Sequence, residues 1–181
     1  MTFYFCGYFP KKTTPLPEGY DLPGVVDIAS VSDCIAEGPE DWINSWTFNE
    51  LGFFDDVGIA EALVPDPDRS KFDIDAYEFL DERFVGGLAE PWTVPPLACK
   101  PPGSDFEPLG FDVVSKSVAD FFECSPLSCN HAAKEFRANA HCLFDALEDA
   151  IAAAKVFSTG NWEPGPYYVA RVSRRRRAAE G

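Results

Sequence analysis

The chain has 181 residues, 46% of them hydrophobic and 25% charged, which is the composition of a globular protein long enough to bury a core. Its formal net charge is −15, and residues 1–170 alone hold 29 acidic and 10 basic residues, a net charge of −19. Such a surface repels phosphate, so we expect no ordinary nucleic-acid binding by the body of the protein. The sequence has no apolar run of about 18 residues, so we expect no membrane-spanning helix.

The N-terminal part begins with an apolar stretch, Phe3 to Phe9, which predicts a β-strand. This stretch lacks the basic flank and the apolar length of a signal peptide, so we expect a cytoplasmic protein. Apolar residues at steps of three and four then predict short helices near 30–37, 57–64 and 72–84.

Residues 86–109 contain six prolines, which are incompatible with a helix or with a central strand. They predict a long connector between an N-terminal helical half, 1–85, and a strand-helix-strand half, 110–173. We treat 1–173 as a single domain, because the first strand is expected to join the C-terminal sheet. We expect the remaining residues, 174–181, to form a disordered basic tail.

The C-terminal half carries the main helix signal, from His141 to Phe157. Its apolar residues recur at steps of four and three, as on one face of an amphipathic helix; they are Leu143, Leu147, Ile151, Ala154 and Phe157. Short apolar segments at 111–116, 120–124 and 166–173 predict strands. The sequence therefore predicts an α/β fold of the α+β type. We expect a small, mainly antiparallel sheet with a long C-terminal helix packed on one face and several short N-terminal helices.

Six cysteines without an export signal are expected to be reduced thiols. Four residues of the C-terminal half are of the types that bind zinc, namely Cys124, Cys129, His131 and His141. If 130–158 were one helix, His131 and Cys142 would be about 16 Å apart, too far to share a metal ion. A zinc site therefore requires a break near Asn139. We expect no cofactor, with zinc as the alternative.

The same residues allow a thiol nucleophile. Cys129 precedes a predicted helix start at Asn130, a position that lowers a thiol pKa, and His131 or His141 could serve as its base. The competing interpretation is that these residues pack in the core as small thiols and hydrogen-bonded histidines.

No phosphate-binding glycine loop, nucleophile elbow or His-Glu-x-x-His motif occurs in the sequence. We therefore interpret the chain as an acidic, soluble protein-binding module that acts on a basic partner protein, in a role such as that of an inhibitor or an immunity-type protein. The alternative is a small thiol- or metal-dependent enzyme that uses the cluster of Cys124, Cys129, His131 and His141.

Overall fold

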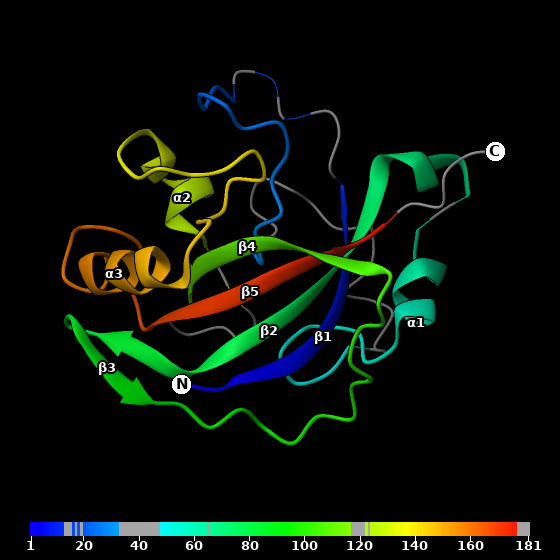
Figure 1. Ribbon diagram of the computed structural model, residues 1–181, viewed down its shortest axis with the longest axis horizontal. Coiled ribbons are helices and arrows are strands. Elements are labelled where there is room, and N and C mark those ends of the chain that lie inside the picture. Colours follow the sequence, from blue (N-terminus) through cyan, green and yellow to red (C-terminus); the bar gives the residue numbers. More distant parts are fainter. Residues whose placement is uncertain are drawn as a thin grey trace.

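The computed structural model describes residues 1–12, 16, 18, 20–32, 48–64, 66–116, 122 and 124–176. Its centre is an antiparallel sheet of five strands in the order β1-β2-β5-β4, and β3 pairs with β2 (Figure 1). The strands are β1 (Phe3–Lys12), β2 (Phe72–Val85), β3 (Leu88–Pro91), β4 (Phe106–Ser115) and β5 (Tyr167–Arg175).

Helices are few and short in the described part of the chain. The three α-helices are α1 (Val57–Ala62), α2 (Pro126–Cys129) and α3 (Leu147–Phe157). Two 3-10 helices, η2 (Asp66–Lys71) and η3 (Ala132–Lys134), complete the set. Only α3 exceeds seven residues, so the prediction of an α/β fold of the α+β type was wrong. The protein is mainly an antiparallel sheet.

The clearest error concerns 72–84, which was predicted as a helix and is the central strand β2. Its apolar residues at steps of four also lie on one face of a strand, because four is an even number. Tyr77 and Phe79 fill the opposite face and are buried as well. A strand buried on both faces loses the alternation that would have distinguished it from a helix.

The long C-terminal helix is also absent from the described residues. The pattern from His141 to Phe157 predicted a helix, but α3 begins only at Leu147. Residues before it adopt extended or left-handed backbone: Cys142 has φ of 58°, and Phe144 forms an isolated β-bridge with Phe111. Pairing with the edge of β4 therefore replaced the first turns of the expected helix.

Other predicted elements lie partly outside the described residues. Of the helix near 30–37, only 30–32 is described, and these residues are not helical. Of the strand near 120–124, residues 122 and 124 are described, and Cys124 makes an isolated bridge to Ser115. The predicted tail 174–181 overlaps the end of β5, and the chain after 176 lies outside the described residues.

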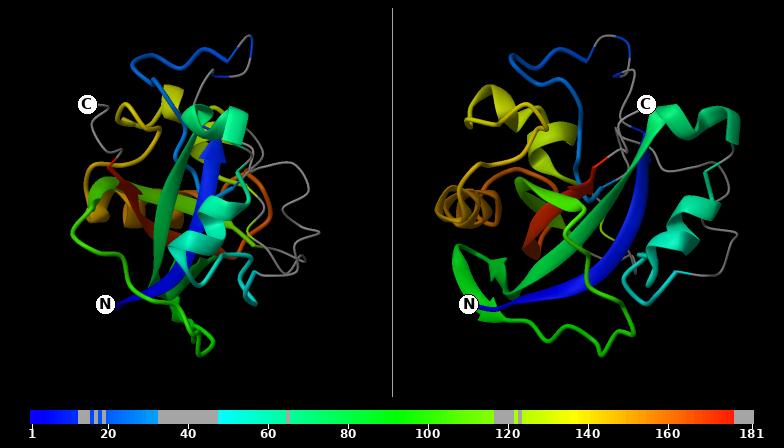
Figure 2. Two further views of the ribbon diagram at one scale, coloured as in Figure 1. Left: turned by 90° about the vertical axis from the view of Figure 1, so that its right-hand side faces the viewer. Right: turned by 45° about the vertical axis from the view of Figure 1, so that its right-hand side comes forward.

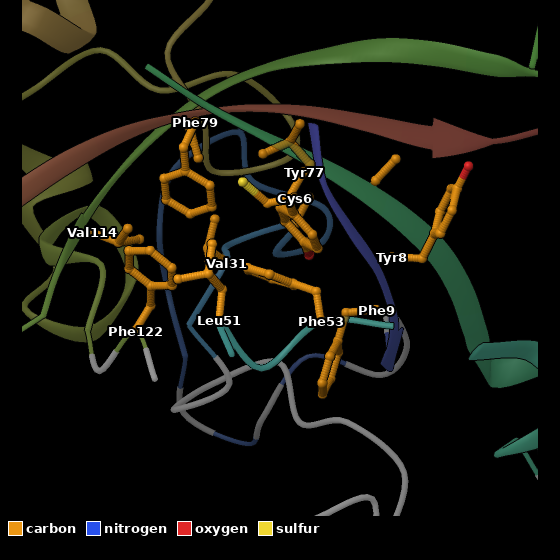
Figure 3. Packing of buried hydrophobic residues seen from close by; sticks show 14 of the residues in the cluster. Cys6, Tyr8, Phe9, Val31, Leu51, Phe53, Tyr77, Phe79, Val114 and Phe122 are labelled. Atoms are coloured by element: carbon orange, nitrogen blue, oxygen red, sulfur yellow. The ribbon is translucent and has the colours of Figure 1, made fainter. Parts of the chain in front are cut away.

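Buried side chains form two clusters. The first lies between the sheet and the segment 48–54, where the rings of Phe53 and Tyr77 stack at 5.1 Å and those of Phe79 and Phe122 at 4.3 Å (Figure 3). The second cluster lies beneath α3, which buries Ala150, Ala153, Ala154 and Phe157.

The sheet is strongly curved, and the right-hand view of Figure 2 shows β1 and β2 bending together into an arc. Gly7 sits at a bulge in β1 with φ of +132°, and a Cβ there would lie 2.7 Å from the Cβ of Phe53. Across the sheet, the rings of Tyr8 and Phe106 approach to 5.5 Å although their strands are at opposite edges. The face that carries these two rings is therefore concave.

Candidate functional site

A group of buried polar side chains lies where residues 27–32, called the pinned segment, pack against the sheet. Asp112 of β4 is fully buried and accepts hydrogen bonds from the Ser30 hydroxyl (2.8 Å), the Val31 amide (2.9 Å) and the Ser125 hydroxyl (2.6 Å). Burial raises the pKa of Asp112, and these donors act against that rise. One carboxylate thus joins three parts of the chain.

A buried ion-pair network adjoins it. The guanidinium of Arg174 donates to both oxygens of Asp75, at 2.7 and 3.0 Å, and to Asp27 at 2.8 Å. Asp75 is 0% exposed and Arg174 is 7% exposed. Burial acts to lower the pKa of Arg174, but the surrounding carboxylates outweigh it and raise that pKa. Burial raises the pKa of Asp75.

His141 joins this network through Nδ1, which is 2.9 Å from Oδ1 of Asp27. Burial alone would raise the pKa of Asp27, but the hydrogen bond with His141 and the charge of Arg174 hold it below its ordinary value. The backbone carbonyl of His141 also accepts from the amide of Ala29 at 3.1 Å. His141 therefore attaches the pinned segment to the loop before α3.

The other residues of the predicted site lie around α2 and η3. The thiol of Cys124 is buried and donates to Asn130 at 3.7 Å. The sulfur of Cys129 is half-buried, 3.9 Å from the Ser32 hydroxyl and 3.8 Å from the hydroxyl of the adjacent serine. His131 has φ of 57°, and its ring packs against Tyr20 at 5.3 Å.

The described residues contain no group of three or more histidine, cysteine or acidic side chains placed to hold a metal ion. His141 uses Nδ1 for Asp27, while the thiol of Cys124 contacts Asn130. The structure therefore gives the zinc alternative no assembled set of ligands within the described part of the chain.

The thiol-nucleophile hypothesis depended on the position of Cys129 before a helix. In the structure Cys129 is the last residue of the four-residue α2, so its thiol does not face a helix N-terminus. Burial raises the pKa of Cys6, Cys99 and Cys142 to about 12 in each case, which keeps these three thiols protonated at neutral pH. The local reason for expecting a reactive thiol at Cys129, a following helix N-terminus, is therefore absent from the structure.

A surface hollow of about 490 Å³ lies elsewhere, beside the segment 48–54. Its described lining mixes apolar and charged side chains: Phe48, Asn49, Glu50, Leu51, Trp92, Pro95 and Lys116. Near it, the Cys99 thiol donates to the Asp55 carboxylate at 2.9 Å, which adds to the rise of the Cys99 pKa. The hollow and the predicted cysteine and histidine residues are separate features.

Sequence reasoning missed the buried network because its members are far apart in the chain. Ser30 and Asp112 are 82 positions apart, and Asp27 and Arg174 are 147 apart. One local signal was present: Asp112 interrupts the apolar strand segment 111–114. An isolated acid in a buried strand requires hydrogen-bond donors, so it indicates a polar contact from another part of the fold.

No protein-family model, curated protein or solved structure matches this chain. Among the helices of the described residues, none has the length and apolar character needed to cross a bilayer.

Proposed function

We propose that the protein binds a basic protein partner through its carboxylate-rich surface, in a non-catalytic role such as that of an inhibitor or an immunity protein. The observation that carries this proposal is the distribution of ion pairs. The described arginines nearest the C-terminus all pair with carboxylates of the same chain; they are Arg171, Arg174, Arg175 and Arg176. The described part of the basic C-terminal segment is therefore paired with carboxylates of the same chain.

Carboxylates remain in excess on the surface. Seven of them are exposed and have no ion pair among the described contacts: Glu18, Asp21, Glu50, Glu135, Asp145, Glu148 and Asp149. With a net charge of −15, this surface attracts cationic proteins over a distance of about one Debye length and repels phosphate backbones. Opposite charge of this kind favours fast and selective association with a basic protein.

The test begins with affinity purification on the full chain, followed by purification of each captured protein and measurement of its binding by calorimetry. We expect a partner with a basic isoelectric point, bound at least about tenfold more weakly at about 300 mM than at about 50 mM NaCl. A purified partner whose affinity does not change with salt would contradict the proposal, as would the absence of any partner that binds after purification.

Two matched variants sharpen the test. In the first, the seven exposed carboxylates named above become amides, and in the second, Lys12, Lys134 and Lys155 become glutamine. All three lysines are exposed. We expect the first variant to weaken partner binding and the second to strengthen it or leave it unchanged. The opposite order would show that acidic charge is not what the partner recognises.

A further inference from the structure

Part of the concave face of the sheet carries aromatic and charged side chains in register. Phe5 of β1 pairs with Glu78 of β2, Glu78 pairs with Arg171 of β5, and Arg171 pairs with Phe111 of β4. Side chains at paired positions point to the same face, so these four form one row across the sheet. With two neighbours on the same face, they define the open sheet face: Phe3, Phe5, Glu78, Glu82, Phe111 and Arg171.

The described helices leave the middle of this surface uncovered, and at its margin Phe3 and Phe111 pack against the cluster beneath α3. In Figure 1, α3 lies beside the left end of the sheet and the connector follows its lower margin, and neither crosses the middle. The Arg171 side chain is 41% exposed and that of Glu78 is 21% exposed. The three phenylalanine rings of the open sheet face are only partly buried. Partly exposed aromatic rings around charged groups are typical of the centre of a protein interface.

The open sheet face already binds one guanidinium, which belongs to the chain itself. Arg171 donates to the two oxygens of Glu78 at 2.6 and 2.7 Å, and its guanidinium carbon lies 4.8 Å from the centre of the Phe3 ring. The rings of Phe3 and Phe111 are 6.1 Å apart. A carboxylate beside an aromatic ring is therefore an arrangement that holds an arginine on this surface.

A second carboxylate of the same face, that of Glu82, lies two positions beyond the β2 residue that pairs with Phe3. The register of β2 with β5 shifts between Phe79 and Arg83, where four steps on β2 face two on β5. This offset of two residues is even, so Glu82 stays on the side of Glu78. Phe3 pairs with Leu80, which is two residues before Glu82 on that side. Glu82 is partly exposed and has no ion pair among the described contacts. The open sheet face thus has two carboxylates and one guanidinium.

We infer that the open sheet face is the docking surface for a basic protein partner, and that an arginine of the partner pairs with Glu82 beside the Phe3 ring. This inference rests on the proposed function and names the surface that performs it. Charge complementarity selects the occupant, because the surface offers an aromatic ring and an unpaired carboxylate. A second copy of the chain is disfavoured, since each copy carries a net charge of −15.

A small probe tests the arginine site without the partner. N-acetyl-arginine amide is titrated into the full, isotope-labelled chain, and backbone amide shifts are followed by NMR; N-acetyl-citrulline amide, which has nearly the same shape and no charge, is the control ligand. We expect saturable shifts at Phe3 and Glu82 with the arginine compound only. Equal shifts with citrulline, or shifts that are spread over all exposed carboxylates, would overturn the inference.

Variants then assign the carboxylate. Glu82→Gln is expected to weaken binding of N-acetyl-arginine amide by about threefold or more, because it removes the charge and keeps the shape. Glu107→Gln, which changes an exposed carboxylate on β4 that already pairs with Arg176, is the matched control and is expected to leave the affinity unchanged. Thermal unfolding of both variants checks that the fold is retained. Unchanged affinity in Glu82→Gln would overturn the assignment.

The purified partner separates the two proposals. If the partner binds in a salt-dependent manner and Glu82→Gln weakens it while Glu107→Gln does not, both proposals are supported. If binding is salt-dependent but Glu82→Gln has no effect, the docking surface is wrong and the proposed function stands. If no purified partner shows salt-dependent binding, the proposed function fails, and with it the docking surface as a site for a protein.

Discussion

Replacing Arg174 by methionine tests the buried network that attaches the pinned segment to the sheet. Methionine keeps much of the length of the side chain but removes the guanidinium, so Asp75 keeps its buried carboxylate without the two hydrogen bonds at 2.7 and 3.0 Å. Asp27 also loses its bond at 2.8 Å. Leaving a buried charge without its partner costs about 3–5 kcal/mol, which is a large part of the 5–15 kcal/mol that stabilises a typical domain.

Urea unfolding followed by circular dichroism measures this loss. The neighbouring Arg175→Met is the matched control, because Arg175 pairs with Glu61 and Asp105 at the surface and its side chain is 34% exposed. We expect this control to cost less than about 1 kcal/mol. Asp75→Asn introduced together with Arg174→Met is expected to recover part of the stability, because it removes the uncompensated charge.

The pH dependence gives an independent check on the same variant. The pKa of Asp75 is raised by burial, and loss of the Arg174 charge raises it further. A carboxyl group whose pKa is higher in the folded than in the unfolded state stabilises the fold most at low pH, and this contribution is lost as pH rises through the folded pKa. The deficit of Arg174→Met relative to the wild type should therefore be larger at about pH 8 than at about pH 5. A cost below about 1 kcal/mol, or a deficit that grows as pH falls, would refute this reasoning.

Three further predictions concern the backbone, the buried carboxylate and a thiol. Gly110→Ala should lower the free energy of unfolding in urea by at least about 2 kcal/mol more than Gly24→Ala does. Both glycines have positive φ, but of the two only Gly110 would place a Cβ 2.5 Å from a carbonyl oxygen. Asp112→Ala should lower the free energy of unfolding by about 3 kcal/mol or more, because it leaves buried hydrogen-bond donors without an acceptor. The control Asp21→Ala, at an exposed residue, should change it by less than about 0.5 kcal/mol. Equal losses in the two variants would contradict the hydrogen-bond argument. Burial raises the pKa of Cys142 to about 12, so mass spectrometry after iodoacetamide treatment at about pH 7.5 should find it unmodified in the folded protein and modified in urea.

The errors in the predicted fold have a common physical origin. The segment 72–84 has apolar residues at steps of four, which satisfy a helix and a strand equally well. Its neighbours decided the outcome, since β1 and β5 pair with it on both sides and both of its faces are buried. The segment before α3 carries a helical pattern too, yet Phe144 pairs with Phe111 instead.

The arrangement of the candidate site residues also depended on tertiary contacts. The sequence identified the residue types that could react, but it placed Cys129 before a helix, and the structure places it at the end of one. The thiol hypothesis offered His131 or His141 as the base for Cys129, and the imidazole of His141 contacts Asp27. The thiol and metal hypotheses depend on distances between separate loops, and spacing along the chain does not fix such distances.

The sequence by itself determined the bulk properties: a chain with an apolar content sufficient for a core, a net charge of −15, and apolar segments at 3–9, 111–116 and 166–173 where β1, β4 and β5 occur. Tertiary structure alone decided that 72–85 is the central strand, that Arg174 is buried among carboxylates, and that Glu82 and Phe3 lie on one open face. The reason is that composition and charge are sums over the chain, whereas strand pairing and ion-pair burial depend on residues about 80 to 150 positions apart.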